Sequence, residues 1–142
     1  MLGDFESAHA AFEQALRYAK HDSQRAAYSD WLYMVLCRLD RTEEADKVLE
    51  PIHSEMEMTG NNHLYLTRLL FYRGDITQEE AEERFSKGGL AFASYFGLGH
   101  WYLVDGDTDR ARDYFKKVVF EGTSWGGFAH VAAEAELARG LL

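Results

Sequence analysis

Side chains that could do chemistry are few in this sequence, and they rarely stand together. His53 and Glu57 are four residues apart, so on a helix they would share one face and could offer two ligands to a metal ion. Two ligands without a third make a weak metal site. We therefore expect a solvated helix face here and no bound metal.

Cys37 and the loop at Gly122–Gly127 are two further candidates. Cys37 is the only cysteine, which excludes an intramolecular disulfide and a zinc-type cysteine pair. It could act as a nucleophile only beside a base, and the role of a small buried hydrophobic residue fits it better. The loop is rich in glycine but lacks the lysine of a phosphate-binding loop. The sequence predicts no catalytic residue and no cofactor.

The charge balance argues against two kinds of partner. The 142 residues include 24 acidic and 15 basic side chains, for a net charge of −9. The longest basic cluster is Lys116-Lys117, too short for the basic patch of a nucleic-acid-binding protein, and the acidic excess disfavours an anionic membrane surface. No apolar run approaches the ~18 residues of a membrane span. We expect a protein or peptide partner, with no nucleic acid and no membrane.

The compartment stays open. Residues 1–6 are acidic and lack the basic region of a signal peptide, and a single cysteine is compatible with a reducing environment. We expect a soluble protein, which would be cytoplasmic as the chain stands, or secreted or periplasmic if the chain has been trimmed.

Apolar residues at helical spacing predict an all-α chain of about eight helices, with no strand. Short connections make neighbouring helices antiparallel. The helices are expected at about residues 4–19, 23–39, 42–52, 64–73, 77–85, 90–104, 108–120 and 128–139, with a short helical segment at 56–58 after the third.

Helix boundaries are expected from capping residues and from the single proline. Ser23 and Thr42 are predicted N-caps, and Thr77 with Glu80 predicts a capping box. Pro51 is expected to end or kink the third helix. These signals place each expected helix on the chain.

A short pattern occurs four times: a turn, then alanine, then a large apolar residue one helical turn later. The four occurrences are Gly3-Asp4 with Ala8 and Phe12, Asp40-Arg41 with Ala45 and Leu49, Gly74-Asp75 with Ala81 and Phe85, and Gly106-Asp107 with Ala111 and Phe115. The alanines recur at intervals of about 30 to 37 residues, which indicates a stacked-repeat fold. Alanine at a helix crossing lets two helices approach closely, and the large residue fills the space beside it.

The stretch at residues 94–118 resembles a tetratricopeptide repeat. Seven residues fit the family pattern: Leu98, Gly99, Tyr102, Gly106, Asp107, Ala111 and Phe115. The second repeat departs from it, since Tyr33 stands at a position that is usually small and Asp40 replaces glycine. The resemblance implies a single domain over residues 1–142, a right-handed α-solenoid of antiparallel helix pairs. Its parts are a half repeat at 1–22, repeats at about 23–58, 59–88 and 89–122, and an unpaired helix at 125–142.

In this family the first helix of each pair lines a concave groove. The resemblance therefore implies a non-enzymatic scaffold that binds a protein or peptide there, with aromatic contacts and arginine forks for an acidic group. The implied groove residues are Met34, Arg38, Leu64, Arg68, Phe71, Tyr72, Phe96, His100 and Val104. The competing hypothesis is an enzyme with a site in the groove, built from Cys37, His100 and Arg68.

The two terminal helices lack partners in the expected series of pairs. We therefore predict that copies associate head to tail into a homo-oligomer, a ring or a filament, through apolar residues at both ends. These residues are Leu2, Phe5 and Phe12 at one end and Val131, Leu137, Leu141 and Leu142 at the other. The alternative is that the chain is a fragment of a longer repeat array that binds a peptide in its groove.

Overall fold

The computed structural model describes residues 4–87, 91–121 and 128–141, but not the side chains of residues 91–93, 128–130 and 141. Within these ranges the chain is helical and contains no strand, so the predicted all-α class is confirmed. The chain divides into two compact units, Met1–Gly88 and Gly89–Leu142. The border between the units coincides with the predicted border between repeats, and the single domain over residues 1–142 stays a prediction.

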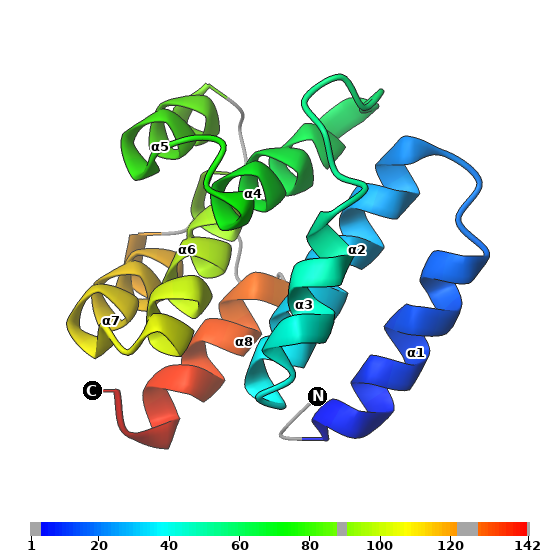
Figure 1. Cartoon of the computed structure of the whole chain (residues 1–142). Coiled ribbons are helices and arrows are strands. Elements are labelled where there is room, and N and C mark those ends of the chain that lie inside the picture. The colour runs from blue at the N-terminus through cyan, green and yellow to red at the C-terminus, as the bar shows by residue number, and fades with distance from the viewer. Residues whose placement is uncertain (1–3, 88–90, 122–127, 142) are drawn as a thin grey trace. The chain divides into compact units, whose positions relative to one another are not determined.

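Within residues 4–87 the first unit contains five α-helices and one short 3-10 helix. α1, α2 and α3 lie side by side (Figure 1), and α2 also packs against α4, which pairs with α5. The bounds are α1 Phe5–Arg17, α2 Asp22–Arg38, α3 Thr42–Leu49, η1 Gly60–Asn62, α4 His63–Arg73 and α5 Gln78–Ser86.

The second unit is a helix pair, α6 with α7, against which α8 packs. Its two helical extensions are π-turns, η2 after α7 and η3 after α8. The helix expected through Phe120 therefore ends earlier as an α-helix and continues as a wider turn. The bounds are α6 Ala91–Asp105, α7 Thr108–Lys116, η2 Lys117–Glu121, α8 Phe128–Glu136 and η3 Leu137–Leu141.

Three hairpins, α2 with α3, α4 with α5 and α6 with α7, close through the same turn. Each has a residue of positive φ after its first helix, namely Asp40 at 56°, Gly74 at 81° and Gly106 at 92°. The next amide donates a hydrogen bond back into that helix, as in a Schellman motif. These bonds are Arg41 N to Leu36 O at 3.0 Å, Asp75 N to Leu70 O at 2.9 Å and Asp107 N to Tyr102 O at 2.9 Å.

The alanine and the large residue after each of these turns are buried. Ala45, Ala81 and Ala111 are 1%, 0% and 0% exposed, and Leu49, Phe85 and Phe115 are 6%, 0% and 0% exposed. The corresponding residues of α1, Ala8 and Phe12, are only half-buried. In each complete hairpin the pattern therefore sits at a closed helix–helix contact, whereas in α1 that contact is partly open.

The α6–α7 pair shows how close the two helices come. A Cβ atom added at Gly99 would lie 2.8 Å from Cε1 of Phe115 and 2.9 Å from its Cδ1. Beside this crossing, the rings of Tyr102 and Tyr114 stack with centroids 5.8 Å apart and planes 3° apart. Gly99 is therefore required by the close approach of the two helices.

Two of the expected helix boundaries are confirmed. Thr77 accepts a hydrogen bond from Glu80 N, and the Glu80 carboxylate accepts one from Thr77 N, which is the predicted capping box. α3 ends at Leu49, just before Pro51. Both features depend on residues within a few positions of one another in the chain.

The other expected caps are wrong. The N-cap of α2 is His21, whose Nδ1 accepts a hydrogen bond from Gln24 N at 3.4 Å. Ser23 lies inside the helix, and its hydroxyl accepts a hydrogen bond from Thr59 N at 2.8 Å. Thr42 is the first residue of α3, and its N-cap, Arg41, makes no side-chain capping bond.

The helical segment expected at residues 56–58 is also wrong. Glu57 N donates to the Asp22 carboxylate at 3.0 Å, and Thr59 N donates to Ser23. Backbone amides that serve distant side chains are not available for helical hydrogen bonds. Residues 50–59 therefore run as an irregular segment attached to the start of α2, until η1 leads into α4.

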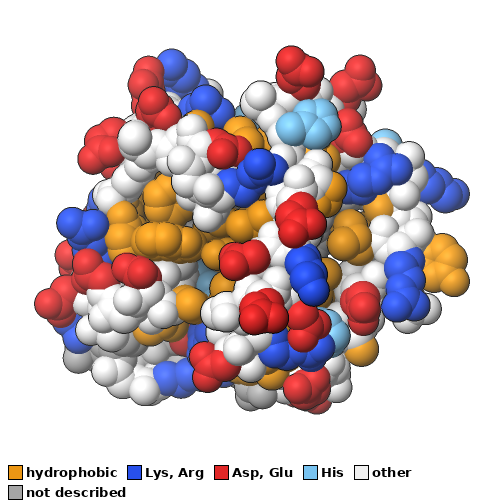
Figure 2. Space-filling model, viewed as in Figure 1, with side chains coloured by type: hydrophobic (Ala, Val, Ile, Leu, Met, Phe, Trp, Pro, Cys, Tyr) orange, Lys and Arg blue, Asp and Glu red, His pale blue; other side chains and the backbone are white. Residues whose placement is uncertain are grey.

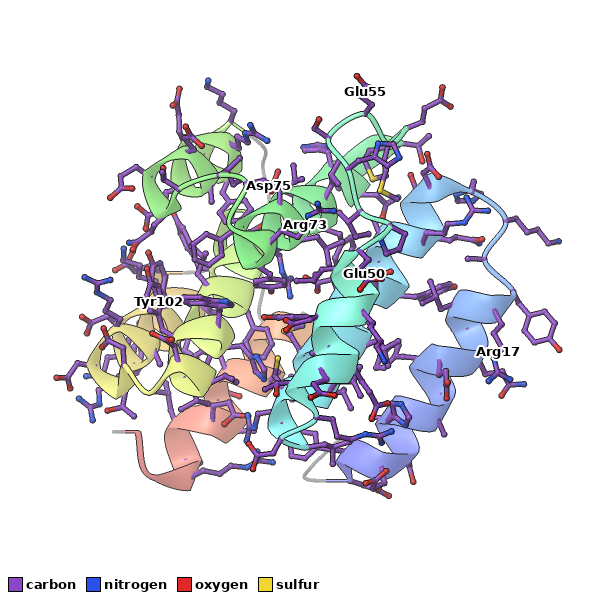
Figure 3. The ribbon with its side chains drawn as sticks, in the orientation of Figure 1. Arg17, Glu50, Glu55, Arg73, Asp75 and Tyr102 are labelled. Carbon is purple, nitrogen blue, oxygen red and sulfur yellow. The ribbon has the colours of Figure 1, made fainter. Side chains whose placement is uncertain are left out.

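Arg73 satisfies the carbonyl groups that α3 leaves open at its end. Its Nη1 donates to Leu49 O at 2.9 Å and to Ile52 O, while its Nε pairs with Asp75 at 3.1 Å. Figure 3 shows this side chain between Asp75 and Glu50. An arginine at the end of α4 thus holds the C-terminal end of α3.

The surface around α3 carries both acidic and basic side chains (Figure 2), and within α3 the acidic ones predominate. One of them, Glu44, forms a bidentate pair with Arg41, both contacts being 2.7 Å long.

No helix within the described ranges combines the length and the apolar character needed to cross a bilayer.

Candidate functional site

Eight of the nine predicted groove residues occupy repeated places on the first helix of each hairpin, and Phe71 is the exception. Counted back from the positive-φ residue of each hairpin, these places are ten, six and two residues earlier, and Asp30 fills the remaining one. The tenth places hold Asp30, Leu64 and Phe96, the sixth Met34, Arg68 and His100, and the second Arg38, Tyr72 and Val104. These places share one helix face, since they are four residues apart.

In the first unit two of these positions form a buried ion pair. Asp30 on α2 is 0% exposed and Arg68 on α4 is 4% exposed. Arg68 Nη2 lies 2.7 Å from Asp30 Oδ2. The pair therefore links the first helices of two successive hairpins, where an apolar contact would be the ordinary choice.

Arg68 has several partners besides Asp30. Its Nε donates to the Tyr72 hydroxyl at 3.3 Å and its Nη2 to Met34 Sδ at 3.4 Å. The guanidinium also lies over the rings of Trp31 and Tyr65, 5.6 and 5.7 Å from their centroids. Cation–π contacts of this kind suit an arginine that is shielded from water.

The pKa values in this cluster respond mainly to burial. Burial raises the pKa of Asp30 to about 6, and the neighbouring Arg68 and Tyr72 offset only part of that rise. Burial is the largest influence on Arg68 and lowers the pKa of its guanidinium, but Asp30, Tyr72 and Tyr65 together raise that pKa by more, so the guanidinium stays protonated. Burial raises the pKa of Tyr72 well above its usual value. The tyrosine is therefore neutral and can act only as a hydrogen-bond partner.

The predicted groove residues of the first unit are mostly committed to internal contacts. Met34, Leu64, Arg68, Phe71 and Tyr72 are each less than a tenth exposed. Arg38 is half-buried and covers the Phe5 ring at 4.9 Å. In this conformation these side chains offer a partner little surface, and their role in a groove stays a prediction.

In the second unit the predicted groove residues pack on aromatic rings. Phe96 lies 5.6 Å from Phe115 and 6.3 Å from His100, centroid to centroid. Phe96 and His100 are buried, whereas Val104 is 40% exposed. Of these three residues, Val104 has the side chain that a partner could contact directly.

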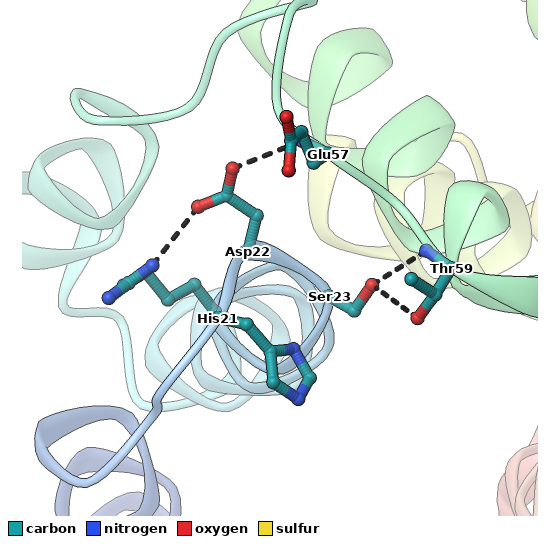
Figure 4. A pocket seen from close by; sticks show the side chains of 6 residues that line it. His21, Asp22, Ser23, Glu57 and Thr59 are labelled. Atoms are coloured by element: carbon teal, nitrogen blue, oxygen red, sulfur yellow. Dashed lines mark hydrogen bonds and ion pairs between the residues drawn. The ribbon is translucent and has the colours of Figure 1, made fainter.

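A pocket of about 300 Å³ lies at the start of α2 (Figure 4). It is lined by His21, Asp22, Ser23, Arg25, Glu57 and Thr59. The amide of Glu57, followed by Arg25, holds the pKa of Asp22 below its usual range. Because the polar groups in it bond one another, the pocket is a structural clasp between α2 and the irregular segment.

α1 offers a different surface. Phe5 lies under Arg38, and the Phe12 ring stacks on Trp31 at 6.2 Å and 13°, so both rings face α2. Beside this contact, Ala8 and Ala15 are half-buried and Ala11 is exposed. These three alanines share one face, being three or four residues apart. We call them the α1 alanine face.

The predicted self-association residues of the C-terminal helix differ in exposure. Val131 is 53% exposed, whereas Leu137 is 4% exposed and is buried. The side chains of Leu2, Leu141 and Leu142 lie outside the described residues. The exposed residues of α8 and η3 include Val131 and Ala138, with half-buried Ala135 between them at helical spacing.

The residues considered for catalysis are placed as follows. Cys37 is buried, and burial raises the pKa of its thiol. Cys37 and Arg68 belong to the first unit and His100 to the second, and the enzyme hypothesis stays untested. His53 and Glu57 lie in the irregular segment, not on a helix, and the loop at 122–127 falls outside the described residues. In the described part of the chain, no group of three or more metal-binding side chains comes together.

The sequence did not lead us to the pairing of Asp30 with Arg68, the clasp of Asp22 and Ser23, or the role of Arg73. The sequence offers one signal for the pairing. An acid, Asp30, and a base, Arg68, occupy two of the repeated groove positions on the first helices of successive hairpins. The clasp and the Arg73 contacts join segments more than twenty residues apart and leave no local pattern.

Comparison with family models, with curated proteins and with solved structures finds no match to this chain.

Proposed function

We propose that this protein is a non-enzymatic scaffold of stacked helix hairpins, of tetratricopeptide type and right-handed, that binds a helical partner. Three hairpins with the same turn and the same buried alanine support this proposal. Repeat folds of this kind mostly present surfaces for binding.

The observation that carries the proposal is the partly open contact on α1. The alanine of the pattern is at most 1% exposed in each of the three complete hairpins, whereas Ala8 is half-buried. In a complete hairpin, a first helix running antiparallel would cover this position. A helix from another molecule that packed there would bury the same face.

The proposed occupant is α8 of a second copy. Val131, Ala135 and Ala138 are spaced four and three residues apart, so they form a stripe of modest side chains on one face. The α1 alanine face has the same character, and small residues allow close helix packing. Contact between two different faces is heterologous, so repeated association gives a ring or a filament.

Two exposed alanines on α1 provide a matched test. Ala11 belongs to the α1 alanine face, whereas Ala10 shares the opposite face with Glu6 and Arg17. We expect light scattering after size exclusion to give a mass above one chain for the wild type, rising with concentration. Ala11→Arg should be a monomer, and Ala10→Arg should match the wild type. A wild type that stays a monodisperse monomer at high concentration would overturn the proposal.

A further inference from the structure

The carboxyl group of Asp30 has an unusual environment that the proposed binding surface does not use. The residue is fully buried, Arg68 lies 2.7 Å away, and Tyr72 is the other side chain that acts on the carboxyl. Neither carboxylate oxygen accepts a well-directed hydrogen bond from the described residues. Buried carboxylates are normally satisfied on both oxygens, so Asp30 is only partly compensated.

Arg68 is much better satisfied than its partner. The Tyr72 hydroxyl, the Met34 sulfur and two aromatic rings all contact its guanidinium. These contacts remain when Asp30 is neutral, because none of them involves an atom of the Asp30 carboxylate. Proton uptake by Asp30 would therefore leave the arginine in place.

Burial and incomplete hydrogen bonding both disfavour the ionised carboxylate more than the neutral acid. Burial is the largest influence on Asp30 and raises its pKa to about 6, against a value of 3.8 without the fold. The native protein therefore binds this proton more tightly than the unfolded chain does.

We propose that Asp30 is a proton-sensitive contact between α2 and α4. The packing of these two helices is more stable when Asp30 is protonated than when it is ionised. The effect arises inside the first unit and is independent of any partner. Through this group, mild acidification would increase the stability of the first unit against unfolding.

The sign of the pH dependence follows from proton linkage. Because the native pKa is higher than the unfolded one, stability from this group is fully present below 3.8 and is lost as the pH rises through about 6. Lowering the pH from 7.5 to 5 should reduce the unfolding equilibrium constant about tenfold through this group.

The groups that act on the Asp30 carboxyl are Arg68 and Tyr72, both on α4. Tyr65 acts on Arg68, and Tyr33 of α2 acts on Tyr72. Among the described residues of the first unit, α1, α3, α5 and η1 contribute no titratable group that acts on this carboxyl. The pH response is therefore assigned to one carboxyl and its α4 neighbours.

The test is urea unfolding of the wild type and of Asp30→Asn at pH 5 and pH 7.5. Asparagine is neutral at both pH values, and the six histidines are common to both proteins. We expect the ratio of the two unfolding constants, wild type over variant, to fall about tenfold at the lower pH. A ratio that does not change with pH would overturn the proposal.

Two controls make the result specific. Asp22→Asn removes a carboxyl whose pKa lies below its usual range, so the ratio for that variant should stay constant between the two pH values. Measurements in the Ala11→Arg background separate the effect from association between copies. If Asp30→Asn does not fold, carboxyl carbon NMR of the wild type decides: one aspartate should titrate near pH 6, and titration of every aspartate below pH 5 would contradict the proposal.

Discussion

The two units differ in the residues that they place ten and six positions before the positive-φ residue of a hairpin. The first unit has a charged pair there, and the second has aromatic rings. In the first unit the tenth and sixth positions supply Asp30 and Arg68, which meet as a buried ion pair between α2 and α4. In the second unit the same positions of α6 supply Phe96 and His100, whose rings pack on each other, and Phe96 also packs on Phe115. The position on the helix therefore determines where a side chain points, while the residue type determines which interaction forms there.

The two kinds of packing differ in what they tolerate. The ionised Asp30 depends on Arg68, because a carboxylate buried without its partner is strongly disfavoured. The aromatic packing beside Gly99 depends on shape, because Phe115 occupies the space that a side chain at position 99 would need. Substitutions at the two places should therefore fail for different reasons.

The largest effect is expected from Arg68→Met, which leaves the Asp30 carboxylate buried without its partner. Breaking a buried pair costs about 3–5 kcal/mol of unfolding free energy. Urea unfolding at pH 7.5 measures it. Arg38→Met is the matched control, since Arg38 is half-buried over Phe5, and it should cost much less. Equal losses in the two variants would show that the ion pair is not special.

Gly99→Ala should cost about 1–3 kcal/mol because the new methyl group would overlap the Phe115 ring. Phe115→Leu in the same chain makes room, so the cost of Gly99→Ala should be smaller in that background. Thermal unfolding of the four proteins in this cycle measures the coupling. Additive losses would mean that the two residues do not compete for space.

A smaller loss, about 1 kcal/mol, is expected from Thr77→Ala, which removes the capping box of α5. Thr42→Ala is the control at the start of α3, where the threonine is not the N-cap, and should change stability by less than about 0.5 kcal/mol. Chemical denaturation of both variants compares them. A larger loss at Thr42 would reverse our assignment of the two helix starts.

The smallest effect, a gain, is expected at the turn of the α2–α3 hairpin. Asp40 has a φ of 56°, where glycine is normally favoured, so Asp40→Gly should stabilise the protein by about 0.5–1 kcal/mol. The reverse exchange in the second unit, Gly106→Asp, should destabilise it by a similar amount. Differential scanning calorimetry of both variants checks the pair, and the same sign for both would contradict the equivalence of the turns.

The helical class, the turns and the α5 capping box could be predicted because each depends on residues close together in the chain. Gly74, Gly106 and the Thr77–Glu80 pair are examples. The caps at Ser23 and Thr42 were mistaken because several nearby residues could start those helices. At Ser23 the choice is tied to a hydrogen bond from the distant Thr59.

The candidate site was less predictable. Arg68 was expected to face a ligand, but in the structure its guanidinium forms an ion pair with Asp30 of another hairpin. That pairing depends on how successive helices pack, which no local pattern encodes. The exposure of Val131 and the burial of Leu137 could not be predicted either, because both are apolar residues of one helical segment.

The central proposal is that the α1 alanine face is covered by α8 of a second copy. A photo-crosslinking amino acid at position 11, with position 10 as control, tests it most directly. We predict a crosslinked pair of chains from position 11 only, with the attachment mapped by mass spectrometry to residues 131–138. Equal crosslinking from both positions, or none from position 11, would contradict the proposal.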